Sequence, residues 1–172
     1  MDSFWKVRII QEYVNLKHFF ATSKTLAQVK HCCYYWKLTK EASQNFYGNA
    51  IFRDYLYNLF LEPRKQISLD LSDCDYITDV SALGNVHTLN LSWCDNVTDV
   101  SALGNVHTLD LSNCDNLTDV SALDNVHTLN LSWCRNITDV SALGNVHTLD
   151  LRGCGNITGV NALGNVHTLY CI

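Results

Sequence analysis

The ten residues at 80–89, VSALGNVHTL, decide the fold because the chain repeats them. The same letters return unchanged at 100–109 and 140–149, and with one substitution at 120–129 and 160–169. Each copy therefore starts twenty positions after the previous one. A fixed period this short is typical of a solenoid, in which one small supersecondary unit is copied and stacked.

Each repeating unit contains one strand and one returning turn. The stretch 88–92 (TLNLS) alternates polar and apolar residues, which predicts a half-buried strand. Residues 92–96 then turn the chain, and 98–103 return it on the convex side. Because so short a unit leaves little room for an α-helix, that side should hold turns or 3₁₀-helix. Residues 66–172 therefore predict an α/β solenoid with a parallel sheet of about six strands, spaced about 4.8 Å apart.

Charge and composition divide the chain into two segments. Residues 1–65 hold ten Lys or Arg against five Asp or Glu, whereas 66–172 hold two against twelve. All six Phe also lie in the first segment. This asymmetry predicts two domains with different roles, with their boundary between residues 65 and 66. The acidic second segment would repel nucleic acid.

The sequence lacks the marks of a membrane-spanning or secreted protein. No run of 18 apolar residues is present, and the first residues lack the charged region, apolar core and cleavage site of a signal peptide. We therefore expect an intracellular protein that makes no membrane contact. In that compartment the eight Cys should be reduced thiols.

The first segment predicts a helical domain that caps the repeat array. Apolar residues recur at helical spacing between Val7 and Val14, and a second helix is expected at about 16–22. A third should start near Ser23 or Thr25 and run towards Trp36. Residues 43–47 and 50–61 predict two further helices. Pro63, the only proline, should end the last of them.

The aligned unit, VHTLNLSWCDNVTDVSALGN, is similar to the leucine-rich repeat, whose pattern is L-x-x-L-x-L-x-x-N/C-x-L. In the second copy the apolar positions of this pattern are filled by Val86, Leu89, Leu91, Cys94, Val97, Val100 and Leu103. The resemblance covers more than half of the chain and implies a solenoid that binds a protein target.

The first segment resembles an F-box. The resembling residues are 9–14 (IIQEYV), 16–20 (LKHFF), 23–24 (SK) and 35–38 (YWKL), while the family's opening Leu-Pro-x-Glu has no counterpart. The resemblance implies that residues 5–40 dock to a Skp1-like protein of a ubiquitin ligase, with the repeats holding the target. Short near-identical repeats behind such a segment also resemble proteins of large DNA viruses of amoebae, which implies the cytoplasm of a host cell.

Identical positions in a solenoid form ladders, and two ladders carry reactive side chains. One thiol per repeat is supplied by Cys74, Cys94, Cys114, Cys134 and Cys154. Such thiols could bind a metal or cross-link, but we interpret them as small buried groups that hydrogen-bond the backbone under the turn. One imidazole per repeat is supplied by His87, His107, His127, His147 and His167. Adjacent imidazoles could bind a metal, but we interpret these as a stacked or solvent-edge column, because the carboxylate or thiolate partners of a metal site are missing.

The strand face is the predicted binding surface, because its outward columns vary while the scaffold is constant. One column reads Asp70, Asn90, Asp110, Asn130, Asp150 and Tyr170. The next reads Ser72, Ser92, Ser112, Ser132 and Arg152, and the flanking column reads Asp73, Trp93, Asn113, Trp133 and Gly153. We predict that a protein target contacts Trp93, Trp133, Arg152 and the first column, since exposed Trp is enriched at interface hot spots. The two indoles could instead shield the edge of the loops. An acidic face bearing Trp suits a basic protein or peptide.

The last strand, 169–172, carries no polar capping unit, so we expect this edge to pair with a partner or a second copy. The sequence contains no Gly-rich phosphate loop, no H-E-x-x-H and no paired C-x-x-C. It therefore predicts neither an enzyme nor a cofactor or metal site. Two functions follow: a protein-recognition module that acts as an F-box-type substrate adaptor, or a structural or assembly protein of a virion or scaffold.

Overall fold

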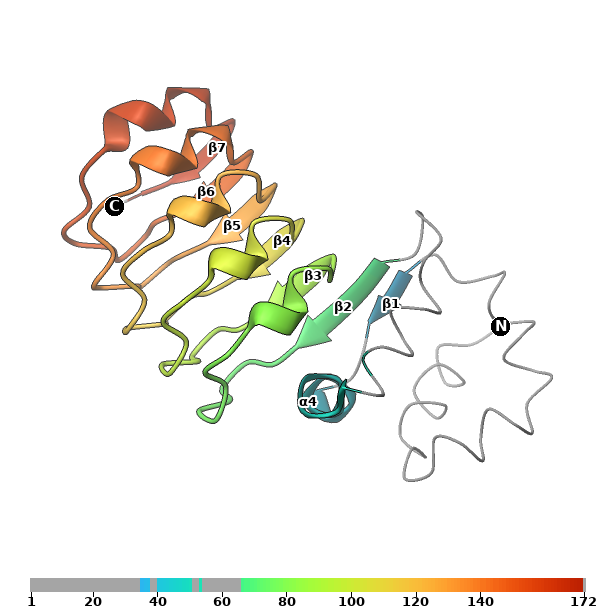
Figure 1. The fold of residues 1–172 in the computed structure, drawn as a ribbon. Coiled ribbons are helices and arrows are strands. Elements are labelled where there is room, and N and C mark those ends of the chain that lie inside the picture. Colours follow the sequence, from blue (N-terminus) through green and yellow to red (C-terminus); the bar gives the residue numbers. More distant parts are fainter. Residues whose placement is uncertain (1–34, 38–39, 51–52, 54–65, 172) are drawn as a thin grey trace, which may run out of the picture. The chain divides into compact units, whose positions relative to one another are not determined.

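The computed structural model describes residues 35–37, 40–50, 53 and 66–171 (Figure 1). The chain forms two compact units, Met1–Asp70 and Leu71–Ile172. The F-box-like motifs before residue 35, and most of the helix expected at 50–61, lie outside the described residues. In the described part of the chain, no helix combines the length and apolar character needed to cross a bilayer.

In the first unit, strand β1 (Tyr35–Lys37) pairs in parallel with strand β2 (Gln66–Asp70), and helix α4 (Lys40–Gly48) separates them in sequence. The Oγ of Ser43, which is fully buried on α4, accepts a hydrogen bond of 3.0 Å from the backbone N–H of Asp70. Helix α4 agrees with the helix expected at 43–47. Strand β1 corrects the expectation of a helix towards Trp36. Aromatic residues favour strands, and here β2 supplies the pairing partner.

The second unit is a solenoid with the predicted period. Figure 1 shows its strands side by side, and they are β3 (Thr88–Asn90), β4 (Thr108–Asp110), β5 (Thr128–Asn130), β6 (Thr148–Asp150) and β7 (Thr168–Tyr170). They pair in parallel and in register, so that Leu89 lies opposite Leu109 and Leu109 opposite Leu129. Each side chain of a repeat therefore shares its environment with its counterparts one period away.

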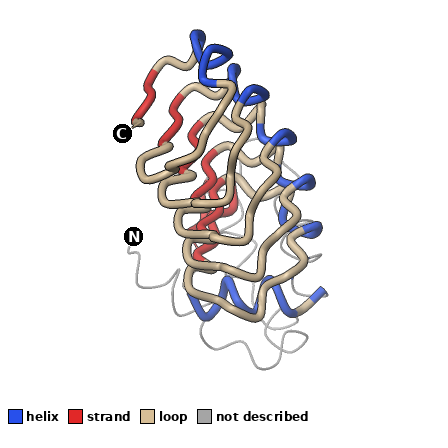
Figure 2. The backbone as a smooth tube through the Cα atoms, turned by 90° about the vertical axis from the view of Figure 1, so that its left-hand side faces the viewer, coloured by secondary structure: helices blue, strands red, loops and turns tan. Residues whose placement is uncertain are grey.

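The opposite side of the solenoid carries one short 3₁₀-helix per repeat, as expected (Figure 2). These are η1 (Ser81–Leu83), η2 (Ser101–Leu103), η3 (Ser121–Leu123), η4 (Ser141–Asn145) and η5 (Val160–Asn165). The carboxylate of Asp99 accepts the backbone N–H of Ser101 at 2.9 Å at the start of η2. This bond lowers the pKa of Asp99, and Asp79, Asp119 and Asp139 make the same contact. The aspartate ladder is thus structural.

The core of the second unit is formed by equivalent apolar side chains between the strands and the 3₁₀-helices. In one repeat they are Leu89, Leu91, Cys94, Val97, Val100, Leu103 and Val106, none more than 2% exposed. The repeat at 160–170 differs, because Leu169 is 38% exposed although Leu149, one period earlier, is fully buried. Val160 and Tyr170 are exposed as well.

Candidate binding surface on the loop edge

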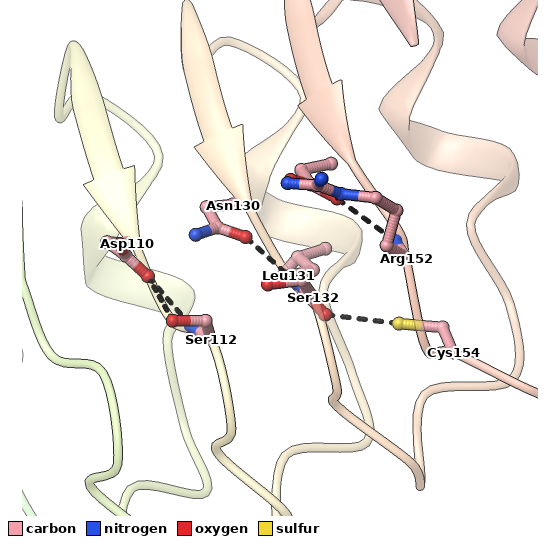
Figure 3. Close-up of polar contacts among 8 residues, drawn as sticks. Asp110, Ser112, Asn130, Leu131, Ser132, Arg152 and Cys154 are labelled. Atoms are coloured by element: carbon pink, nitrogen blue, oxygen red, sulfur yellow. Dashed lines mark hydrogen bonds and ion pairs between the residues drawn. The ribbon is translucent and has the colours of Figure 1, made fainter. Parts of the chain in front are cut away.

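The strand-face column of Asn and Asp is half-buried and occupied by local hydrogen bonds (Figure 3). Each Oδ1 accepts the backbone N–H of the residue two positions later, at 2.9–3.0 Å, and the acceptors are Asn90, Asp110, Asn130 and Asp150. This is the Asx turn, in which a side chain imitates a backbone turn. The Asx turns of this column therefore end the strands, and the Oδ1 atoms are less available to a target than the sequence suggested.

The serine column corrects a second expectation. Ser92, Ser112 and Ser132 are buried rather than open to solvent. The Asn or Asp side chain two residues earlier turns back and accepts the backbone N–H of each serine. At Ser112 the hydroxyl also donates a hydrogen bond of 2.7 Å to Asp110. The serines thus belong to the turn, and only Arg152 in this column is exposed among the residues from 92 onward.

Arg152 and Tyr170 are brought together at the end of the predicted site. The guanidinium of Arg152 forms an ion pair of 2.6 Å with Asp150 and lies 5.3 Å from the centre of the Tyr170 ring. Burial alone would raise the pKa of Asp150, but the hydrogen bonds and charge of Arg152 lower it. Asp70 lies at the end of β2 in the first unit and is half-buried.

The two tryptophans stand on the loop edge, which we define as residues 73–76, 93–96, 113–116 and 133–136, directly after the strand region of each repeat. Trp93 is 58% exposed and Trp133 is 52% exposed. Both have a left-handed backbone, with φ of 63° and 65°. Asn and Asp tolerate this conformation, but for a bulky side chain it is rare and strained. Strained, exposed residues of this kind cluster at binding sites.

The ring of Trp133 also covers part of the next repeat. A Cβ built on Gly153 would lie 2.6 Å from the Cδ2 atom of Trp133, so the indole fills the space that a side chain at 153 would need. The Trp133 ring thus shields part of the loop edge, while about half of its surface stays open to solvent and available to a target.

Tyr76 is a residue of the loop edge that the sequence analysis missed. Its side chain is 57% exposed. The equivalent position in the following repeats is Asn96, Asn116, Asn136 and Asn156. These asparagines support the turn, since Nδ2 of Asn96 donates to the carbonyl of Asp75 and Asn116 and Asn136 repeat the contact. The sequence signal that could have identified Tyr76 is a tyrosine at a position where the later repeats have asparagine.

The cysteine ladder is structural, as predicted. The Sγ atoms of Cys94, Cys114, Cys134 and Cys154 each donate to the backbone carbonyl 23 residues earlier, at 3.1–3.2 Å. The bond from Cys154 to the carbonyl of Leu131 is drawn in Figure 3. Burial raises the pKa of Cys114 and Cys134 to about 12, which keeps these thiols protonated and unreactive.

The histidine ladder is a stacked column, also as predicted. Neighbouring ring centroids lie 4.5–4.6 Å apart from His87 to His167. Partial burial, then the neighbouring His107, lowers the pKa of His87. For the lowered pKa of His147 the causes are desolvation, then His127 and His167. Among the described residues, no group of three His, Cys, Asp or Glu side chains is placed to hold a metal ion.

Comparison with known proteins identifies the repeats. Residues 67–84, 85–104 and 125–144 match the family model described as "Leucine Rich repeat". Together with the period, the parallel strands and the 3₁₀ turns, this match shows that the array has the leucine-rich-repeat solenoid fold. No curated protein sequence matches the chain.

Two bacterial proteins of known structure resemble the chain in part. An internalin (inlF) from Listeria monocytogenes aligns with 21% identity and a TM-score of 0.43, covering 61% of this chain and 32% of the internalin. Internalin C2 (inlC2) from the same organism aligns with 17% identity and a TM-score of 0.40, covering 63% of this chain and 62% of that one. The chain thus spans less than two thirds of either internalin.

Proposed function

We propose that the protein is a recognition module and that the loop edge around Trp93 and Trp133 contacts its protein target. Leucine-rich repeats generally mediate protein–protein interaction and are typically non-catalytic. One observation carries the proposal: two largely exposed indoles stand at backbone positions where Asn, Asp or Gly would be less strained. Shielding of the loop edge uses only part of each ring, and strained, exposed Trp is typical of binding sites and interface hot spots.

The test replaces each tryptophan by the residue that its own column already contains. Asn113 has the same left-handed backbone, so Trp93→Asn and Trp133→Asn should keep the fold. Proteins captured from a cell lysate by the full chain are then compared with those captured by the double variant. We expect at least one direct binder, reproduced with purified protein, to lose 10-fold or more in affinity. Equal binding of both chains by every purified binder would remove the loop edge as the target site.

The more specific role is a substrate adaptor of a ubiquitin ligase. Here residues 1–65 would dock to a Skp1-like protein through the F-box-like stretch at 5–40, while 66–172 hold the target. Such an adaptor would work in the cytoplasm, that of a host cell if the protein is viral. This role is supported by the sequence resemblance alone, and most of the stretch lies outside the described residues.

Binding of a purified Skp1-like protein tests this role independently. The full chain should bind it, and the double tryptophan variant should bind it equally well, because the two surfaces lie in different segments. Absence of binding would reject the adaptor role and leave recognition by the loop edge intact.

A structural or assembly role is the second candidate, and the exposed repeat at 160–170 favours it. Leu169 and Val160 expose apolar surface that Leu149 and Val140 bury one period earlier. Pairing of β7 with another copy of the chain would cover this surface. Sedimentation should then show a dimer that Leu169→Lys dissociates. A monomer at all concentrations would exclude self-association.

A further inference from the structure

The two exposed indoles have a defined spacing. Hydrogen bonds between repeats continue beyond the strands into the loop edge, since the backbone N–H of Trp93 donates to Ser112 and that of Asn113 to Ser132, both at 2.9 Å. Adjacent parallel segments lie about 4.8 Å apart, so two repeats separate Trp93 from Trp133 by about 9.6 Å. The residues at the same position in the repeats after Trp93 and Trp133 are Asn113 and Gly153, so the two indoles are the only bulky side chains of this column and stand two repeats apart.

The two indoles differ in their electrostatic surroundings. Asp73, Asp75 and Asp95 are exposed on the loop edge in the first repeat and in the repeat of Trp93. The position equivalent to Asp95 in the repeat of Trp133 is Arg135, and the next copy has glycine. The repeat between the two indoles carries Asp115, so Arg135 is the only difference in sign in this column. A cation is therefore more favoured over the Trp93 ring, where carboxylates and the indole both attract it, than at Trp133, where Arg135 opposes it.

Building on the proposed function, we propose that the loop edge binds a polyproline-II segment with an arginine and a proline three residues apart. The arginine lies over Trp93 and the proline against Trp133. A polyproline-II helix has three residues per turn and rises about 3.1 Å per residue, so residues i and i+3 lie on one side about 9.3 Å apart. Aromatic surfaces are the usual docking sites for such segments.

Other backbone conformations fit this surface less well. In a β-strand, residues on the same side are separated by two or four positions, or about 6.7 or 13 Å. An α-helix spans about 10.5 Å in seven residues, but it also presents apolar anchors at the turn between them. That intermediate anchor would face Asn113, which is polar.

Three synthetic peptides of equal length and otherwise identical composition test the proposal. The first has Arg-x-x-Pro, the second Arg-x-x-x-Pro, and the third Glu-x-x-Pro, each within a proline-rich context. Binding to the full chain is measured by tryptophan fluorescence and by calorimetry. We expect the first peptide to bind at least 10-fold more tightly than the other two, with an affinity that falls as salt is added.

Variants of the chain assign the binding to the loop edge. Trp93→Asn and Trp133→Asn should each weaken binding of the first peptide by 10-fold or more. Asp95→Asn should weaken it several-fold. Asp119→Asn, which removes the same charge on the opposite side of the solenoid, should leave it unchanged.

Three results would overturn the inference: no binding of the first peptide, equal binding of the two spacings, or unchanged binding by the tryptophan variants. If the loop edge nevertheless retains Trp-dependent protein binders, recognition stands and only the polyproline-II ligand is wrong.

Discussion

The buried columns and the loop edge of this solenoid follow opposite rules. In the core, each position holds nearly the same residue in every repeat, and Leu91, Leu111 and Leu131 are all fully buried. On the loop edge, one backbone position with a left-handed conformation holds Asp, Trp, Asn and Trp in turn. Core packing thus allows essentially one residue type at each position, whereas the loop edge allows several. A residue that is poorly suited to its backbone conformation, such as Trp93, is therefore the one that indicates a role in binding.

Truncation of a core side chain should give the largest loss in the free energy of unfolding. Leu111 is fully buried, so Leu111→Ala should lower the free energy of unfolding by roughly 3 kcal/mol through lost transfer energy and a cavity. Leu169→Ala is the matched control in the exposed repeat and should cost less than about 1 kcal/mol. Chemical denaturation of both variants measures the difference, and equal losses would contradict the difference in burial between the two leucines.

A methyl group at Gly153 should have the next largest effect. Its φ of 78° and the adjacent Trp133 ring both oppose a Cβ, so Gly153→Ala should lower the free energy of unfolding by about 1–2 kcal/mol. In the Trp133→Asn background the steric part disappears and the loss should shrink. A double-mutant cycle measures this coupling. Additive losses would show that the indole does not cover position 153.

The cysteine ladder should respond more weakly to substitution. Cys114→Ala removes a thiol that donates to the Leu91 carbonyl at 3.2 Å, and we expect a loss of about 1 kcal/mol. Because burial raises the pKa of Cys114 to about 12, an alkylating reagent at pH 8 should modify the exposed Cys171 before it modifies Cys114. Mass spectrometry after brief labelling checks this order. Labelling of Cys114 in the folded chain at the rate of Cys171 would be evidence against it.

The smallest of these effects on stability should be that of lowering the pH from 8 to 5. The pKa values of His87 and His147 are lowered in the fold, so the unfolded chain binds protons more readily. Their contribution is fully present above the unfolded value of about 6.5 and is lost as the pH falls below it. The melting temperature should therefore fall between pH 8 and pH 5, and His147→Asn should reduce the change. A flat profile would refute crowding in the stack. The aspartates with lowered pKa values act in a separate window, below about pH 4.

Much of this architecture could be predicted because a pattern that is ambiguous in one segment is repeated in every unit. Leu89 alone could belong to a strand or a helix, but its recurrence as Leu109, Leu129 and Leu149 restricts the chain to a stacked parallel sheet. The cysteine and histidine ladders followed from the same reasoning. The strand at Tyr35–Lys37 did not, since its conformation depends on pairing with β2, which is distant in sequence.

The candidate site was predicted less well than the fold. Trp93 and Trp133 were predicted because exposed Trp is enriched at interface hot spots, whereas Tyr76, which stands where the later repeats have Asn, was missed. Asn90 and its equivalents were predicted to face a target, but their oxygen atoms end the strands. Alternation along a strand indicates which side a residue is on. It does not show whether a neighbouring backbone N–H already occupies that residue.

The sequence alone determined the period, the strand and turn of each unit, the ladders and the acidic charge, because each is a property of one unit copied many times. Only the tertiary structure decided which outward residues stay open. The left-handed backbone at Trp93, the burial of Ser112 and the indole over Gly153 all arise between adjacent repeats or from how the chain bends within one. Those contacts depend on distances that a linear pattern does not contain.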